Sequence, residues 1–199
     1  MDEAAIDRTM MERCLRLSVT AARRGELPFA CVICDGDEVI AEATNRVRRE
    51  GDVTRHAELV AISDAQHTLG RKNLSRCTIY SNVEPCPMCS FPIRETRMKR
   101  VVYAIGSPKM GGLSKWNILR DTQISNLMPE AFGPVPEVVA GFMGREAEMV
   151  WWKWHPIIWA VIKQRGCFAP ALAADTFDRM QAIPPPHGWI RSLLMLHNN

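Results

Sequence analysis

The stretch TRHAELVA (residues 54–61) places a histidine and a glutamate, His56 and Glu58, at the start of a predicted helix. We expect this helix to begin at about His56 and to run to Leu69, because Gly70 follows and glycine commonly ends a helix. An imidazole and a carboxylate in one helical turn have two interpretations. They form either an ordinary helix start or part of a metal site, and the rest of the sequence has to decide.

A Cys-x-x-Cys pair lies in the stretch EPCPMC (residues 84–89), directly after CTIYSNV (residues 77–83), which is typical of a short buried strand. Such pairs occur both in thioredoxin-like redox sites and in metal sites. In an α/β sheet, helix starts that follow adjacent strands converge, so His56, Cys86 and Cys89 can meet. Three protein ligands leave the fourth tetrahedral position free for water, which is typical of catalytic zinc, Zn²⁺.

Glu58 is too close to His56 along the helix to be a convenient fourth ligand, but its carboxylate can reach water bound at the metal. Zinc lowers the pKa of that water to about 7, and a neighbouring carboxylate can accept and return its proton. The positive ends of two helices would also stabilise thiolates. The pattern therefore predicts a catalytic role for Glu58.

The composition is that of an ordinary globular domain: 199 residues, 47% hydrophobic and 24% charged, with a net charge of +3. No apolar run is long enough to cross a membrane, and the acidic start lacks the apolar segment of a secretory signal, so we expect a cytoplasmic protein with no membrane partner. The seven cysteines are expected to be thiols or metal ligands. The mild positive charge permits anionic partners without requiring them.

Helices and strands alternate along the chain. Apolar residues at helical spacing predict a first helix that Gly25 ends, and a Gly-Asp turn predicts a hairpin. Pro92 is expected to kink or end the helix after Cys86. The remaining expected elements are strands at 77–83, 100–106 and 137–143, a short helix within 107–121, and a helix at 144–154 that His155-Pro156 interrupts. We expect a three-layer α/β/α sandwich with a central mixed sheet of about five strands.

The chain resembles the cytidine deaminase superfamily from about Leu27 to Ile105. The motifs HAE (residues 56–58) and PCPMC (residues 85–89) match the His-x-Glu and Pro-Cys-x-x-Cys signature of zinc-dependent nucleobase deaminases. The resemblance implies that His56, Cys86 and Cys89 hold zinc, that Glu58 carries protons, and that an aminated ring is hydrolysed with release of ammonia. It also implies a homodimer. Residues 1–165 would form the deaminase domain, and residues 166–199 an extension packed on it or on a dimer partner.

Within the superfamily, HAELVA is similar to the branch of tRNA adenosine deaminases and bacterial guanine deaminases. Val60 replaces the asparagine that is typical of deoxycytidylate deaminases, and His56 replaces the cysteine of small cytidine deaminases. LPFACVI (residues 27–33) resembles the Pro-Phe-Gly-Ala-Val run of this branch, with Ala30 and Cys31 in place of Gly-Ala.

The resemblance also implies residues around the substrate. In such proteins the backbone N–H at the Ala57 position bonds the ring carbonyl, and an asparagine at the Asn45 position bonds the base. A turn residue at the end of a strand is the alternative for Asn45. Glu84 is expected to orient the cysteine loop, with direct contact to the substrate as the alternative. The further candidates for substrate contact are Phe29, Trp116 and His155.

Two substrate classes remain open. Arginines at 46, 48, 49 and 55, and at 94, 97 and 100, are compatible with RNA, although a solvated loop is the simpler explanation. The segment MVWWKWHPIIWAVI (residues 149–162) is apolar and suited to packing, with a lid over the pocket as the alternative. We therefore expect a small-molecule substrate, with free guanine favoured over cytosine and related aminated rings such as triazines. The alternatives are adenosine in tRNA and a non-catalytic zinc-stabilised binding protein, against which Glu58 argues.

Overall fold

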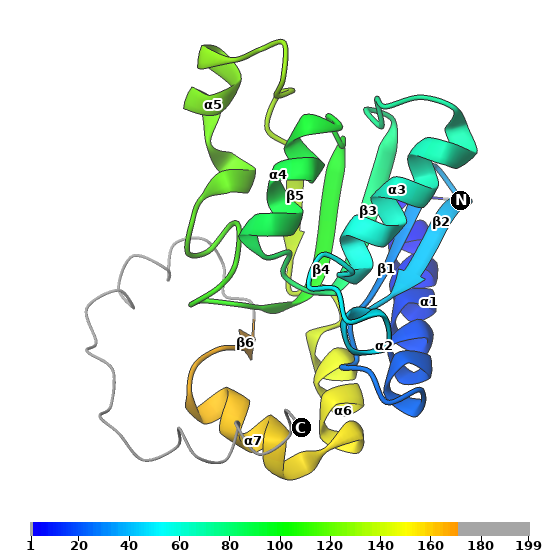
Figure 1. The fold of residues 1–199 in the computed structure, drawn as a ribbon, viewed down its shortest axis with the longest axis vertical. Helices are drawn as coiled ribbons and strands as arrows, with labels where there is room; N and C mark the ends of the chain where they lie inside the picture. Colours follow the sequence, from blue (N-terminus) through cyan, green and yellow to red (C-terminus); the bar gives the residue numbers. More distant parts are fainter. Residues whose placement is uncertain (1, 171–199) are drawn as a thin grey trace.

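The computed structural model describes residues 2–170 (Figure 1). Its sheet has the order β2-β1-β3-β4-β5, and β6 pairs with the C-terminal end of β4. The strands are β1 (Ala30–Asp35), β2 (Glu38–Thr44), β3 (Cys77–Val83), β4 (Arg100–Gly106), β5 (Glu137–Ala140) and β6 (Ala169–Pro170). The predicted mixed sheet is confirmed, since β1 is antiparallel to β2 and β3 while β4 is parallel to β3 and β5.

Helices cover both faces of this sheet, as Figure 1 shows. The helices are α1 (Glu3–Arg23), α2 (Val47–Glu50), α3 (Ala57–Leu69), α4 (Pro87–Glu95), α5 (Thr122–Leu127), α6 (Gly144–Trp154) and α7 (Pro156–Gln164), with a 3₁₀ turn at Ile118–Arg120. Alternate residues of the central strands enter separate cores. Ile79 packs with residues of α3 and α4, and its neighbour Tyr80 packs with residues of α1 and α6. The predicted three-layer architecture is confirmed.

The hairpin between β1 and β2 forms where the Gly-Asp pair predicted a turn. Asp35 pairs with Glu38, which leaves two residues for the turn, and Gly36 has φ +62°. This left-handed backbone conformation favours glycine, because a side chain there is strained. The hairpin brings the start of β1 and the end of β2 to one edge of the sheet.

Buried polar contacts join the layers as well as apolar packing. The Arg100 guanidinium of β4 donates two hydrogen bonds to the Asp7 carboxylate of α1, over 2.6 and 2.9 Å, and the Tyr80 hydroxyl donates to the same carboxylate over 2.7 Å. Asp7 and Arg100 are both at least nine-tenths buried. The N-terminal helix is thereby held against two strands of the sheet.

Three local features differ from the sequence-based expectations. The segment expected as a basic loop contains α2. The backbone N–H groups of Arg48 and Arg49 in this helix donate hydrogen bonds to the carboxylate of Glu26, which is more distant in the sequence. Helix α4 continues through Pro92 to Glu95. The interior proline removes one hydrogen bond of the helix, and packing of Ile93 in the core offsets this loss. After the interruption at His155, the chain forms another helix, α7.

The beginning of the predicted C-terminal extension packs on the domain. Phe168 is buried, with ring centroids 5.2 Å from Trp151 and 6.2 Å from Trp159. Residues 171–199 lie outside the described residues, so the placement of the extension and the domain boundary stay predictions. Among the described residues, no helix combines the length and the apolar character needed to cross a membrane.

Candidate active site

The candidate site lies where α3 and α4 begin, at the edge of the sheet formed by the C-terminal ends of β3 and β4 (Figure 1). His56 is the N-cap residue of α3 and Cys86 is the N-cap residue of α4, and neither side chain caps its helix. Pro87 occupies the first turn of α4, where its missing N–H costs nothing. Both helices therefore begin on a potential metal ligand, with their positive ends directed at the site.

His56, Cys86 and Cys89 form a group that could hold a metal ion. Their ligand atoms lie within 4.8 Å of one another, and each pair among His56 Nδ1, Cys86 Sγ and Cys89 Sγ is separated by 3.5 Å. Tetrahedral zinc with ordinary bond lengths requires about 3.8 Å between two sulfurs and about 3.6 Å between sulfur and nitrogen. One imidazole and two thiols at these separations fit zinc.

The two cysteines have pKa values shifted in opposite directions. A hydrogen bond from the Cys89 thiol lowers the pKa of Cys86 to about 4, with support from His56 and against the effect of burial. The neighbouring Cys86 sulfur and burial raise the pKa of Cys89 well above its usual range. The hydrogen bond with Cys86 raises the pKa of His56. A bound cation would favour the thiolate form of both cysteines.

Glu58 projects from the first turn of α3 into the same group. Its Oε2 lies 3.6 Å from Cys89 Sγ, and its Oε1 accepts a hydrogen bond from the Ser81 hydroxyl over 3.1 Å. The side chain is buried, and this burial raises its pKa. A buried carboxylate with one oxygen beside the ligand atoms is placed to exchange protons there.

Glu84 holds a neighbouring loop against the cysteine turn. Its buried carboxylate accepts hydrogen bonds from the backbone N–H groups of Ser107, Leu113 and Ser114 and from the Ser114 hydroxyl. The loop approaches so closely that a Cβ on Gly111 would lie 2.0 Å from the carboxylate. These contacts use both oxygens of the side chain, and the expected role of orienting the cysteine loop stays a prediction.

Ala57 directly follows the ligand residue His56, and Asn45 is linked to the same segment through the backbone. Asn45 follows β2, and the adjacent Arg46 N–H donates to the carbonyl of Arg55, the residue before His56. The Asn45 side chain is 5% exposed and donates to Glu26. Ala57 is the first residue of α3, so its N–H has no acceptor within the helix. Their predicted contacts with substrate stay predictions.

The remaining candidates have other contacts in the structure. Phe29 packs edge-on against Trp151, with ring centroids 5.0 Å apart. Trp116 is 58% exposed in the loop that Glu84 holds. His155 is exposed and caps α7 by accepting the N–H of Ile158. Direct contact of these three residues with substrate stays a prediction.

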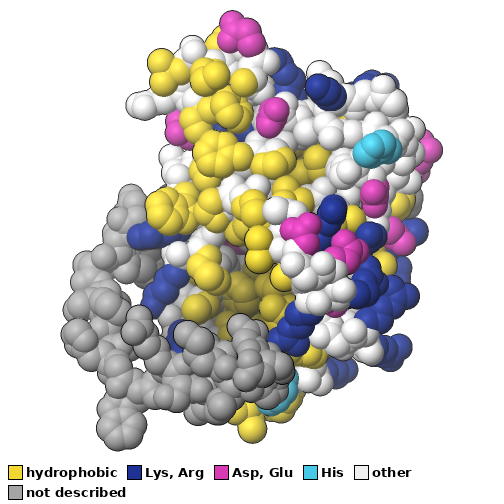
Figure 2. Space-filling view, viewed as in Figure 1, with side chains coloured by type: hydrophobic (Ala, Val, Ile, Leu, Met, Phe, Trp, Pro, Cys, Tyr) yellow, Lys and Arg dark blue, Asp and Glu magenta, His cyan; other side chains and the backbone are white. Residues whose placement is uncertain are grey.

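The arginines separate into two groups. Arg94 and Arg100 are buried, and Arg94 donates to the backbone carbonyls of Ile118 and Gly133, so both have structural roles. The arginines of the 46–55 loop are half-buried or exposed. Arg46, Arg49 and Arg55 form ion pairs with Glu50 or Asp52, and Arg48 donates to the Gly25 carbonyl. Four arginines against two carboxylates leave this loop positively charged. Figure 2 shows Lys and Arg side chains beside the hollow on this face of the molecule.

Three residues near the site were not found from the sequence. The Ser81 hydroxyl donates to Glu58, and the Asn45 amide donates to Glu26. The Asn82 side chain accepts the N–H of Ala30 and donates to the carbonyl of Pro28, at the start of β1. Ser81 and Asn82 lie inside an apolar strand, and polar residues at buried strand positions are a usable signal. Glu26 follows the first helix and carries no such signal.

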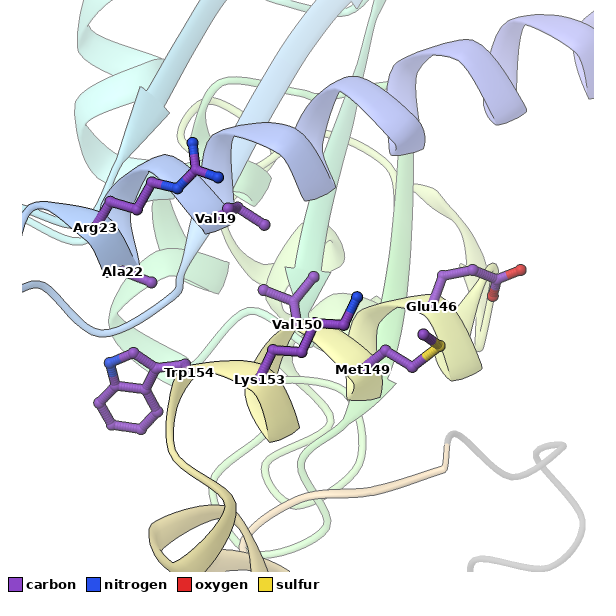
Figure 3. A pocket seen from close by; sticks show the side chains of 8 residues that line it. All are labelled: Val19, Ala22, Arg23, Glu146, Met149, Val150, Lys153 and Trp154. Carbon is purple, nitrogen blue, oxygen red and sulfur yellow. The ribbon is translucent and has the colours of Figure 1, made fainter.

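A groove lies elsewhere, between α1 and α6 (Figure 3). It has a volume of about 540 Å³, and Val19 and Ala22 of α1 face Met149 and Val150 of α6 across it. None of its lining residues belongs to the ligand group. The groove is a feature of the packing between these two helices.

Comparison with known proteins agrees with this fold and this ligand group. Residues 4–105 match the model of the cytidine and deoxycytidylate deaminase zinc-binding region. The chain therefore belongs to this family, within the cytidine deaminase superfamily.

Several relatives carry specific names. A tRNA-specific adenosine deaminase of Aquifex aeolicus is 34% identical over 62% of this chain and 82% of its own length. A structure from a study of A-to-I editing by tRNA:A34 deaminases has a TM-score of 0.65 and 30% identity, over 72% of this chain and 99% of its own. A guanine deaminase of Bacillus subtilis has a TM-score of 0.50 and 36% identity, over 54% and 66%. A tRNA(Ile)-lysidine synthase of Deinococcus deserti is 36% identical over 71% of this chain, which spans only 25% of that synthase.

Proposed function

We propose that this protein is a zinc-dependent hydrolytic deaminase of an aminated nucleobase. The observation that carries the proposal is the position of Glu58, whose carboxylate lies 3.6 Å from Cys89 Sγ within a His/Cys/Cys group that fits zinc. A zinc site with a purely structural role requires no buried carboxylate beside its ligands. The non-catalytic alternative is therefore not favoured.

In this proposal the chain's own residues bind the metal, move protons and orient the ring. His56, Cys86 and Cys89 hold zinc, which when bound would make water at the site a nucleophile near neutral pH. Glu58 accepts a proton from water and delivers it to the exocyclic amine, so that one water is consumed and one ammonia leaves. The Ala57 N–H and the Asn45 side chain hold the ring by hydrogen bonds.

Adenosine in tRNA is the substrate that the relatives favour, in place of the free guanine favoured from the sequence alone. The tRNA deaminase relatives cover more of this chain and align with more of their own length than the guanine deaminase does. The positively charged 46–55 loop, which the Arg46–Arg55 hydrogen bond closes and which directly precedes His56, supports an anionic substrate. Free guanine is the second candidate, supported by the identity to the guanine deaminase of Bacillus subtilis.

A substrate panel tests both levels of this proposal. Zinc-loaded protein is incubated with tRNA, guanine, adenine, cytosine, their nucleosides and aminotriazines, while ammonia release and inosine in digested tRNA are measured. Inosine formation in tRNA supports the favoured substrate, and turnover of guanine alone replaces it with the second candidate. Absence of ammonia release from every member of the panel contradicts deaminase activity.

The proposed location is cytoplasmic, and the proposed assembly is a homodimer. Figure 2 shows hydrophobic side chains gathered along α4 and α5, where Phe91 is 43% exposed and its ring lies 6.1 Å from that of Phe132. Light scattering after size exclusion is expected to give twice the chain mass, and Phe91→Glu is expected to shift it toward one chain. A monomeric wild-type protein would contradict the dimer.

A further inference from the structure

Glu26 is a buried carboxylate next to the candidate site, and the proposed mechanism makes no use of it. It is 3% exposed and follows the first helix. Its Oε2 accepts hydrogen bonds from Asn45 Nδ2 over 3.0 Å and from Arg48 N over 3.3 Å, and its Oε1 accepts from Arg49 N over 2.8 Å. One side chain thus contacts both the Asn45 amide and the backbone of the loop that follows it.

Neutral N–H donors satisfy this carboxylate. Within residues 2–170, no lysine or arginine side chain forms an ion pair with Glu26. A buried carboxylate without a cationic partner depends strongly on its hydrogen bonds, because each unsatisfied oxygen would lose its hydration without replacement. The Asn45 amide is therefore held firmly by Glu26.

This contact fixes the orientation of the amide. An ionised carboxylate only accepts hydrogen bonds, so the NH₂ group of Asn45 must face Glu26 and its Oδ1 must face away. One amide N–H is occupied, and the other N–H and the Oδ1 atom remain as one donor and one acceptor. An amide that could flip would present these groups interchangeably to a ligand.

The backbone links the oriented amide to the ligand group. The Asn45 N–H donates to the Phe29 carbonyl over 3.0 Å, and the next N–H, of Arg46, donates to the Arg55 carbonyl over 3.0 Å. Arg55 directly precedes His56 in the sequence. The position of Asn45 relative to His56 therefore depends on the hydrogen-bonded segment 46–55, and the Glu26 carboxylate binds the backbone of this segment.

We propose that Glu26 is a positioning residue that determines substrate specificity by fixing which donor and which acceptor of Asn45 meet the base. This inference rests on the proposed function, because it assumes that Asn45 contacts the substrate. Glu26 itself touches neither substrate nor metal. The effect of replacing it should pass through Asn45 and appear in substrate binding.

The test is a double-mutant cycle with Glu26→Gln and Asn45→Ala, measured as kcat and KM on the substrate found in the panel. Glutamine keeps the size of the side chain, but its NH₂ group must oppose either the Asn45 amide or the Arg49 N–H. We expect KM to rise about tenfold with little change in kcat, since the lost contact holds the bound base in both ground and transition states. Zinc content should stay at the wild-type level. In the Asn45→Ala background the same change should raise KM less than about threefold.

Glu95→Gln is the control, because it removes an exposed carboxylate at the end of α4, outside the 46–55 loop and away from the hydrogen bonds of Asn45. A KM rise of equal size in both backgrounds, or an equal rise in the control, overturns the proposal. A second readout does not need activity: the side-chain amide signal of Asn45 in an ¹⁵N-correlated NMR spectrum should shift in Glu26→Gln and not in Glu95→Gln. If no substrate is turned over, the proposed function fails, and an unshifted amide signal would independently overturn the role of Glu26.

Discussion

Glu58 and Cys89 lie 31 residues apart in the sequence, yet Glu58 Oε2 is 3.6 Å from Cys89 Sγ. Three elements produce this contact. Helix α3 carries Glu58, α4 carries Cys89, and the Ser81 hydroxyl of β3 holds the other carboxylate oxygen. The contact joins the proposed proton carrier to the metal group, and it leads to the first prediction.

Replacing Glu58 with glutamine should remove activity and leave the metal bound. An amide cannot carry the proton, and loss of a general acid–base group typically costs roughly 10²–10⁴-fold in rate. Ammonia release and zinc content per chain are the two measurements. A variant that keeps wild-type turnover would disprove the proposed role of Glu58.

The ligand assignment predicts that Cys86→Ser and Cys89→Ser each lose zinc. Both sulfurs belong to the group in which each pair of ligand atoms is 3.5 Å apart, so neither has a substitute there. Zinc content by mass spectrometry is the measurement, and Cys167→Ser is the control because Cys167 is outside the group. Wild-type zinc content in either site variant would show that the ligands are wrong. A chelator should also lower the melting temperature of the wild type, because a metal that binds only the native state stabilises it.

Glu84→Gln should loosen the loop at 107–114 and speed the loss of zinc. The carboxylate accepts four hydrogen bonds with its two oxygens, and an amide nitrogen cannot accept any of them. We expect zinc to dissociate about tenfold faster, in the range typical of groups that orient metal ligands. Release to a chromogenic chelator is the measurement.

Two further variants make the Glu84 prediction specific. Gly111→Ala should act in the same direction, because its Cβ would lie 2.0 Å from the carboxylate and the loop would have to move. Glu95→Gln, an exposed change at the end of α4, should leave the release rate unchanged. If Glu84→Gln released zinc at the same rate as Glu95→Gln, Glu84 would not support the cysteine turn.

Breaking the buried pair between Asp7 and Arg100 should destabilise the fold strongly. The hydrogen bonds to Asp7 raise the pKa of Arg100. Without Asp7 the guanidinium still stays charged, because an arginine is not deprotonated in proteins, so the variant leaves a buried charge without this partner. Removing one partner of a buried pair costs about 3–5 kcal/mol. Asp7→Ala and Arg100→Met should each show this loss in urea unfolding, and the double variant should lose less than the sum. Additive losses would mean that the two groups do not interact.

Stability should decrease above the usual pKa of a thiol. Burial raises the pKa of Cys14 and of Cys31, and both side chains are 0% exposed. Above about pH 8.5 these thiols lose their protons in the unfolded chain but keep them in the native state, so the unfolding free energy falls as pH rises. At one pH unit above this value the loss is about 1.4 kcal/mol for each such cysteine. Urea midpoints at pH 7.5 and 9.5 measure it, and Cys14→Ala should reduce the difference.

The elements around the site were predictable to the extent that local patterns determine them. The hairpin, α3 and α6 lie where apolar spacing and the residues Gly36, Gly70 and His155 placed their ends. Helix α2 was missed because its N–H groups depend on Glu26, which is far away in the sequence. Pro92 was misjudged because packing of α4 outweighs the lost hydrogen bond.

The sequence by itself determined the chemistry of the donor set. His56, Glu58, Cys86 and Cys89 were identified because helix starts at the same edge of an α/β sheet converge, although the structure places β1 between the two strands that precede these helices. Only the tertiary structure decided how these groups are held. Ser81, Glu84 and Glu26 act through partners that approach only when the sheet forms, and Arg94 and Arg100 changed from candidates for RNA contact to buried structural residues. A buried hydrogen bond depends on the three-dimensional position of both partners, and spacing along the chain does not encode that position.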